Sequence, residues 1–513
     1  MSDDRLRWGR GVLVGLSMIL GLALLAVVAV YVVTSTDWGR ERVRRIGQSF
    51  IGSMVHGNVK IGRLSGNLLT GMTIHDFSIT DSSGAPFATV ESFTATYSIV
   101  SLLRKHVWIE DAVIVRPLIV LDRPPNGKWN WQRIIRRDST KKSATHQPTW
   151  GDWIRFSNSR VVNGQLVVRS PWKPSSGLSA AARDSVIREA LAGKSRLVIE
   201  QVRGGFQKTV QLDSVNGTFP LLRLTEPGMK SRLLEVSSMT MNAYPFRPPA
   251  AVVRDLKGAF AFDNDSAWWK GAYVAMPKSK ATGNGVYEFT SGDLTMSVHS
   301  DPASFVDMRW IYPRLPSDGR GAVDLDLKWR GSVQDYYVRK SDVTIGKARG
   351  SGTIGVTLAD TVSIHDANVR FSGVDTRLLE QLMPNFSSPR RGVLSGRVKA
   401  DGGMHALVLN TDVTFDDQRA GRSRLIAVGE VGLVGRKDLR ARDLRLEMLP
   451  VQVEMARTWM PKLPVGGVVV GSATVNGLSS SDMRVVGDVT HADGGARSRF
   501  DGTPHYRSSA FSL

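Results

Sequence analysis

The chain contains no cysteine, so it can form neither a disulfide bond nor a cysteine zinc site. The motifs of several common enzyme classes are also missing: there is no H-E-x-x-H, no G-x-S-x-G and no P-loop. The nine histidines are dispersed and do not follow metal-ligand spacing. We therefore expect a protein that is not an enzyme and that holds neither a cofactor nor a metal ion.

Two short patterns imitate active-site motifs. Gly350, Gly352 and Gly355 spell G-x-G-x-x-G, but Ile354, Val356 and Leu358 alternate with polar residues afterwards, which predicts a strand in place of the helix that a dinucleotide site requires. Asp324 and Asp326 form a carboxylate pair that alternates with apolar residues, which indicates the solvated face of a strand.

Acidic residues are fewer than basic ones, 47 against 67, which gives a formal net charge of +20. One interpretation is an arginine-rich, solvated outer surface, and a second is attraction to anionic lipid headgroups or acidic envelope polymers. The basic residues are spread along the chain, so we expect no nucleic-acid partner.

Charged residues are absent from residues 11–33, where Ser17 is the only polar interruption. A helix of this length is about 34 Å long, enough to cross a hydrocarbon core of roughly 30 Å. The run predicts a retained transmembrane anchor; a cleaved signal peptide and a buried soluble helix are the alternatives. We expect residues 1–10 in the cytoplasm and the body in the periplasm, as in a single-pass protein of the bacterial inner membrane.

Residues 36–54 predict a short amphipathic helix, with Thr36 or Asp37 as its cap. Its apolar stripe consists of Val43, Ile46, Phe50 and Met54, and arginines crowd its first half. Two interpretations stay open: the helix lies at the level of the lipid headgroups, or it plugs the end of the sheet that follows.

From Gly57 onward the hydrophobic period is two, which predicts strands. The residues of 323–330 (VDLDLKWR) place four apolar side chains on one face and four charged ones on the other. We predict a mainly β protein: a long, repetitive antiparallel sheet curled into a gutter, with few short helices.

An interruption of the period is visible early in the sheet, where Met72 and Ile74 are one position out of phase with Phe77 and Ile79. This slip predicts a bulge or bend at residues 75–76.

The polar stretch 138–149 predicts a linker between an N-terminal β-domain, 57–137, and a repetitive body, 150–513. A repeat is visible in the body: a Pro-containing apolar turn, a glycine and then an alternating strand, starting near residues 312, 383 and 460. Its glycines, Gly321, Gly392 and Gly467, recur after 71 and 75 residues (392 − 321 and 467 − 392). Stacked supersecondary units that bury a shared face are the expected consequence.

Residues 62–103 and 107–134, together with the anchor and the YPRLP-type repeats, resemble the AsmA-like family of envelope proteins, its TamB branch most closely. The matching features are the glycine-bounded apolar entry, the hydrophobic-x-x-Pro strand pair and the GKWNW turn. The resemblance implies a phospholipid carrier anchored in the inner membrane, with a link to outer-membrane protein assembly or secretion through an outer-membrane partner. TamB-like chains are longer and end in a C-terminal β-domain, so we expect a short or truncated member.

An apolar sheet face must be hidden from water, at about 25 cal/mol per Å². A sheet curled into a gutter can bury its apolar face against lipid acyl chains. Such a groove needs no catalytic residue. The candidate groove-lining residues are Ile74, Ile79, Phe93, Tyr97, Val323, Leu325, Leu327, Leu407, Leu409, Val413 and Phe415. The alternative for all of them is the core of a dry β-repeat scaffold that binds protein partners.

Overall fold

The computed structural model describes residues 36–67, 71–134, 152–174, 177–331, 333–359, 361–383, 386–388, 390–434, 438–456, 466–479, 481–502, 505–507 and 510–512. The predicted span 11–33, the linker 138–149 and the third repeat turn at residue 460 lie outside these residues. The chain divides into two compact units. The first is Met1–Lys173, Arg188–Arg247 and Ala259–Ala261; the second is Pro174–Ile187, Pro248–Gly258 and Phe262–Leu513.

The protein is mainly β, as the alternating pattern predicts. The first unit contains three helices among its described residues, α2 (Asp37–Met54), α3 (Ile99–Leu103) and α4 (Asn130–Ile134). Its strands are β1 (Gly57–Lys60), β2 (Arg63–Asn67), β3 (Gly71–Asp81), β4 (Pro86–Tyr97), β5 (His106–Val115), β6 (Leu118–Asp122), β7 (Trp153–Trp172), β8 (Val198–Val202), β9 (Gly205–Thr225), β10 (Arg232–Val236) and β11 (Ser238–Tyr244).

The sheet of the first unit departs from the expected all-antiparallel order. Strand β7 pairs in parallel with both β5 and β6 and antiparallel with β9. Parallel neighbours need a long crossover connection, because the chain must return to the edge where the first strand began. The polar stretch 138–149 falls between α4 and β7 in the sequence and lies outside the described residues, so its role as a linker between domains stays a prediction.

A small hydrophobic core lies in the first unit. Val55, Val59 and Ile134 are buried together, and four partly buried side chains pack against them: Ile51, Phe77, Ile79 and Phe87. The end of α2 contributes Ile51, so this helix covers one face of the first strands. Thr36 caps α2, accepting a hydrogen bond from the Gly39 amide at 3.3 Å. The helix predicted over 36–54 is therefore present, and its C-terminal half packs on the first strands.

Three elements lie where the chain passes from one unit to the other. Helix α5 (Ala180–Leu191) and strand β13 (Asp255–Phe262) each contain residues of both units, and β12 (Ala251–Val253) belongs to the second.

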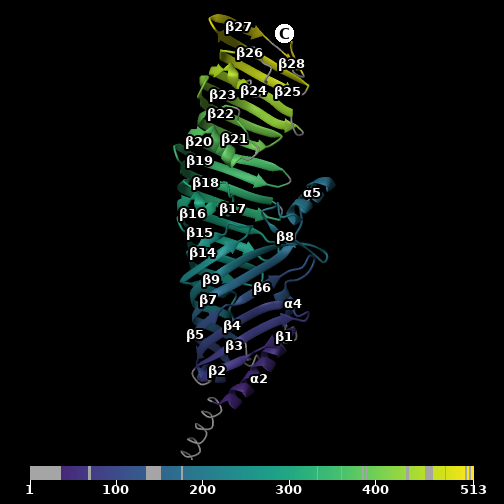
Figure 1. Cartoon of the computed structure of the whole chain (residues 1–513), viewed down its shortest axis with the longest axis vertical. Helices are drawn as coiled ribbons and strands as arrows, with labels where there is room; N and C mark the ends of the chain where they lie inside the picture. Colours follow the sequence, from purple (N-terminus) through teal and green to yellow (C-terminus); the bar gives the residue numbers. More distant parts are fainter. Residues whose placement is uncertain are drawn as a thin grey trace, which may run out of the picture. The chain divides into compact units, whose positions relative to one another are not determined.

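The second unit is a ladder of strands in chain order (Figure 1). Its strands are β14 (Ser266–Ala275), β15 (Lys280–Glu288), β16 (Leu294–Ser304), β17 (Arg320–Arg330), β18 (Val333–Ile345), β19 (Ala348–Leu358), β20 (Val362–Asp375), β21 (Gly392–Gly403), β22 (Ala406–Asp417), β23 (Gly421–Val434), β24 (Asp438–Gln452), β25 (Val468–Leu478), β26 (Asp482–Asp493), β27 (Ala496–Gly502), β28 (His505–Arg507) and β29 (Ala510–Ser512). From β14 to β27 each strand pairs antiparallel with the next one along the chain.

Three short helical segments punctuate this ladder: η1 (Phe305–Met308), α6 (Thr376–Leu382) and α7 (Val453–Ala456). They precede β17, β21 and β25, so one repeat consists of four strands and one helical connection. Because the strand number per repeat is even, all three connections lie at the same edge of the ladder. Neighbouring connections touch: the Tyr312 hydroxyl donates to the Leu382 carbonyl, and the Gln381 amide donates to the Arg314 carbonyl at 3.1 Å.

The three repeat glycines occupy equivalent positions. A Cβ atom added at Gly321, Gly392 or Gly467 would lie within 2.0–2.4 Å of a carbonyl oxygen on the neighbouring strand. Each repeat therefore begins where two backbones approach so closely that a side chain does not fit.

Candidate functional site

One face of the second unit is apolar along consecutive strands. In β17, Val323, Leu325 and Leu327 share a face, and the register sets Leu325 beside Val298 of β16 and Leu327 beside Tyr336 of β18. Since pairing aligns side chains of the same face, the apolar stripe of β17 continues into both neighbours.

The same face continues through the next repeat. Leu407, Leu409, Val413 and Phe415 of β22 share it, as predicted from their alternation. The register adds residues that were not among the candidate groove residues, and we call the whole set the apolar face. Its further members include Val338, Ile354, Val356, Val369, Phe371, Leu394, Val398, Val431, Leu446, Met448, Val475, Val485 and Val489.

Burial on the apolar face is partial. Leu327 and Phe415 are the most buried of its predicted members, at 7% and 5% exposure, and the other five are half-buried. Elsewhere on this face the fully buried positions are mostly alanine, such as Ala400 and Ala427. The strands from β14 to β27 form one ladder in chain order, so among the described residues no separate second sheet is available to cover the apolar face.

Bulges bend these strands. The register shifts within β18–β19, β19–β20, β20–β21, β23–β24 and β24–β25. Gly352, Gly396, Gly429 and Gly471 have φ between 133° and 156°, and a Cβ atom on any of them would lie 2.0–2.6 Å from a carbonyl oxygen of the adjacent strand. Bulges of this kind increase local twist and bend a strand.

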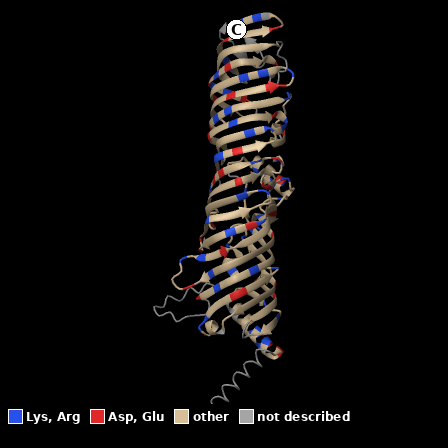
Figure 2. Ribbon diagram, turned by 90° about the vertical axis from the view of Figure 1, so that its left-hand side faces the viewer, with Lys and Arg blue, Asp and Glu red and all other residues tan. Residues whose placement is uncertain are grey.

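The opposite face of the second unit, which we call the charged face, carries basic and acidic residues in alternation with the apolar ones. Figure 2 shows both signs of charge mixed along the strands. Arg424 and Asp412 form a two-point ion pair with both N–O distances 2.9 Å, and Arg499 and Asp488 form another. These ion pairs are exposed, so they contribute little to the stability of the fold. Their main effect is to keep this face polar and solvated.

Two histidines lie in cross-strand contacts of the charged face. The His299 ring lies 2.6 Å from the Asp324 carboxylate, and this hydrogen bond lowers the pKa of Asp324. His365 lies 3.0 Å from Asp366 and 2.8 Å from Asp335, and these hydrogen bonds raise the pKa of His365. Neither histidine belongs to a cluster of three potential metal ligands among the described residues.

The two patterns that imitate active sites have structural roles. The G-x-G-x-x-G segment lies in strand β19 and no helix follows it. Asp326 accepts a hydrogen bond from Ser297 at 2.6 Å and pairs with Arg339 at 2.7 Å, within the charged face.

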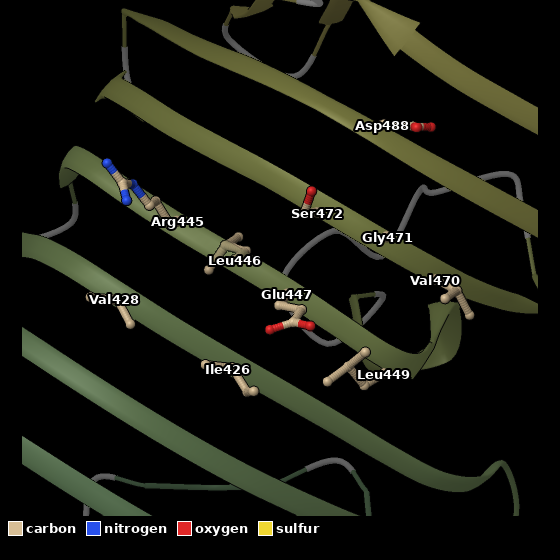
Figure 3. Close-up of a pocket in the computed structure, with 10 residues that line it drawn as sticks. All are labelled: Ile426, Val428, Arg445, Leu446, Glu447, Leu449, Val470, Gly471, Ser472 and Asp488. Atoms are coloured by element: carbon tan, nitrogen blue, oxygen red, sulfur yellow. The ribbon is translucent and has the colours of Figure 1, made fainter.

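A hollow of about 590 Å³ lies on the charged face of β23 to β26 (Figure 3). It is open to solvent, and its lining mixes Arg445, Glu447 and Asp488 with Ile426 and Val470. Basic, acidic and apolar groups meet there without a common ligand chemistry, so the hollow does not define a binding site.

The candidate residues of the first unit fall into two groups. Ile74 pairs with Phe93, and Tyr97 lies on the same side of β4, where burial raises the pKa of its hydroxyl. Ile79 pairs with Ala88 of β4 and with Val59 of β1, and it packs against the small core under α2.

The bulge or bend predicted at residues 75–76 coincides with an interruption of this pairing, which passes from His75–Ser92 directly to Phe77–Val90. Asp76 takes a left-handed conformation there, with φ of 53°, at the point where the apolar alternation changes phase.

None of the helices within the described residues is both long enough and apolar enough to span a bilayer. Comparison with protein-family models, with curated proteins and with solved structures found no match to this chain.

Proposed function

We propose that this protein is an envelope lipid carrier, anchored in the bacterial inner membrane by residues 11–33, whose second unit holds phospholipid acyl chains against the apolar face. The body lies in the periplasm and the N-terminus in the cytoplasm. No bond is made or broken in this function, so it requires neither a catalytic residue nor a cofactor.

One observation carries the proposal: a continuous apolar face on a single ladder of strands, with half-buried leucine, valine and aromatic side chains. Left in water, such a face would cost about 25 cal/mol per Å². Acyl chains can cover this face because they are apolar and flexible, and because their packing does not depend on the register of the strands. The bulges and the glycines of unusual φ support a sheet curled into a gutter around those chains.

The resemblance to AsmA-like proteins points the same way, as does the net positive charge, which suits anionic lipids. A dry scaffold that binds protein partners is the competing function, and it requires the same face to be covered by another protein.

Adjacent residues of β22 provide a matched test. Leu409 belongs to the apolar face, whereas Val408 is 56% exposed on the charged face. A photo-crosslinking amino acid at position 409 of the full chain, irradiated in cells, should form adducts with phospholipid that mass spectrometry detects. The same group at position 408 should form few or none. Equal yields at both positions, or protein adducts alone at position 409, would reject the lipid-carrier proposal.

A charge substitution adds a functional readout. Leu409→Glu should reduce co-purifying phospholipid several-fold, whereas Val408→Glu, the same kind of change on the other face, should leave it unaltered. Circular dichroism of both variants separates lost binding from lost folding.

A further inference from the structure

The structure orients helix α2 along the first strands. The Arg40 side chain donates to the Gly66 carbonyl at 3.4 Å, and the Arg44 side chain donates to the Ile61 carbonyl at 2.8 Å. The helix therefore begins beside the end of β2 and runs toward the small core, where Ile51 packs. Only its first two turns, which include Trp38 and Arg42, are free to meet a surface beyond that end of the sheet.

Helix α3 lies at the same end. Asn67 of β2 pairs with Gly71 of β3, and Gly71 pairs with Thr96 of β4, directly before α3. The first two turns of α2 and the whole of α3 thus share one end of the sheet β2–β3–β4, which we call the basal end.

The basal end exposes large apolar side chains next to basic ones. Leu103 is 80% exposed, Val100 60% and Trp38 66%. Arg104 and Lys105 follow Leu103 directly and are exposed, and Lys105 takes a left-handed conformation with φ of 64°, so the chain turns sharply there. The guanidinium group of Arg42 lies 5.9 Å from the Trp38 ring.

This combination is unusual for a surface in water but typical of one that meets lipid. Transfer of an exposed leucine side chain from water into a bilayer is favourable, because it removes apolar surface from water. Tryptophan and arginine side chains are favoured in the headgroup layer. Three residues separate Val33, the end of the apolar run, from Asp37, the start of α2. If the run crosses the membrane, the basal end is held within about 14 Å of the bilayer surface.

We propose that the basal end is a membrane-docking surface, in which Leu103 and Val100 enter the lipid and Arg42, Arg104 and Lys105 meet anionic phospholipid headgroups. This inference rests on the proposed anchor and adds to it a fixed orientation of the first unit on the bilayer. A docked end stands the strands β3 and β4 upright, which would prevent the first unit from tumbling around a flexible tether.

The lack of cysteine permits a direct test, because a single introduced cysteine is the only labelling site. The full chain with Leu103→Cys carries an environment-sensitive dye and is reconstituted into vesicles of phosphatidylcholine with phosphatidylglycerol. Ser83→Cys is the control, because Ser83 follows Asp81 at the other end of β3, about 35 Å away. The dye at 103 should be quenched by brominated lipid and shielded from acrylamide, and the dye at 83 should behave in the opposite way. Equal acrylamide quenching at the two positions would overturn the proposal.

Charge reversal tests the headgroup contacts. Adding Arg104→Glu and Lys105→Glu to the labelled chain should raise acrylamide quenching at position 103 at least two-fold in the anionic vesicles. In vesicles of phosphatidylcholine alone the same reversal should change little. Quenching that ignores both the reversal and the lipid composition contradicts a role for anionic headgroups.

The lipid-carrier proposal has separate readouts. A chain that fails to incorporate into vesicles argues against the anchor, whereas one that incorporates but leaves Leu103 in water argues only against the docking surface. Crosslinking of phospholipid at position 409 reports on the apolar face regardless of both.

Discussion

At the scale of single residues, the most tightly held acidic group of the second unit is Asp417. It is buried, forms a two-point ion pair with Arg390, and accepts hydrogen bonds from the backbone amides of Arg419 and Ala420 at 2.8 and 2.9 Å. The hydrogen bonds from Arg390 lower the pKa of Asp417 to about 2. These contacts fasten the connection before β21 to the end of β22.

This pairing predicts an acid-sensitive contribution to stability. A carboxyl whose pKa is lowered on folding stabilises the protein above its unfolded pKa, near 3.9, and loses that effect as the pH falls toward 2. Asp417→Asn should reduce the free energy of unfolding at neutral pH by about 2 kcal/mol and flatten its decline between pH 4 and pH 2. Urea denaturation followed by circular dichroism at several pH values measures both.

Asp416→Asn is the matched control. Its carboxylate is exposed and lies 3.7 Å from Arg422, so its removal should cost much less. Equal losses in the two variants would show that the Asp417 pair adds nothing specific.

At the scale of elements, the sequence predicts strands well because their alternation is strong. The segments 323–330 and 407–415 form β17 and β22, and the residues of 350–355 form part of β19 as expected. Alternation identifies the two faces of a strand but not its partners. Several other members of the apolar face, such as Val369 and Val398, were found from the register, because bulges shift the phase of alternation in strand pairs such as β19–β20 and β20–β21.

The parallel pairing of β5 and β6 with β7 could not be predicted from the sequence, because composition does not show how a connection runs. A polar, glycine-poor linker has the same composition whether it joins two domains or crosses over a sheet. The change of phase in the sequence locates the irregularity at Asp76, but alternation alone cannot show that a left-handed residue causes it.

Two glycines of β19 give a matched test of strand geometry. Gly352 has φ of 133°, and a Cβ atom there would lie 2.0 Å from the Asn368 carbonyl oxygen, whereas a Cβ atom at Gly350 would meet nothing within 4 Å. Gly352→Ala should lower the free energy of unfolding by about 1–3 kcal/mol, because it adds backbone strain and a steric clash. Gly350→Ala should be neutral or slightly stabilising. Thermal unfolding of both variants decides the point, and equal melting temperatures would contradict this geometry.

At the scale of the whole molecule, the second unit is a linear array in which each strand meets only its neighbours in the ladder. Stability in such an array is a sum of nearest-neighbour contributions, so a complete repeat can be added without disturbing the others. Duplicating residues 321–391, from the first repeat glycine to the residue before the second, should yield a folded chain with added β signal in circular dichroism and unchanged or higher stability.

A duplication of half a repeat, residues 321–345, offers the contrasting case. It adds strands without the helical connection, so the edge contacts between Tyr312 and Leu382 and between Gln381 and Arg314 would be separated. This variant should be less stable than the full duplication. If the two variants unfold alike, the helical connections do not define the repeat.

The even strand number of each repeat has a consequence for how such a protein can change in length. Every repeat returns the chain to the edge from which it started, so an ancestral gene could gain or lose one by simple tandem duplication without rerouting the backbone. Four strands at about 4.8 Å advance the ladder by roughly 19 Å. The length of the ladder is then set in increments of that size, so related chains would differ in length by a whole number of repeats.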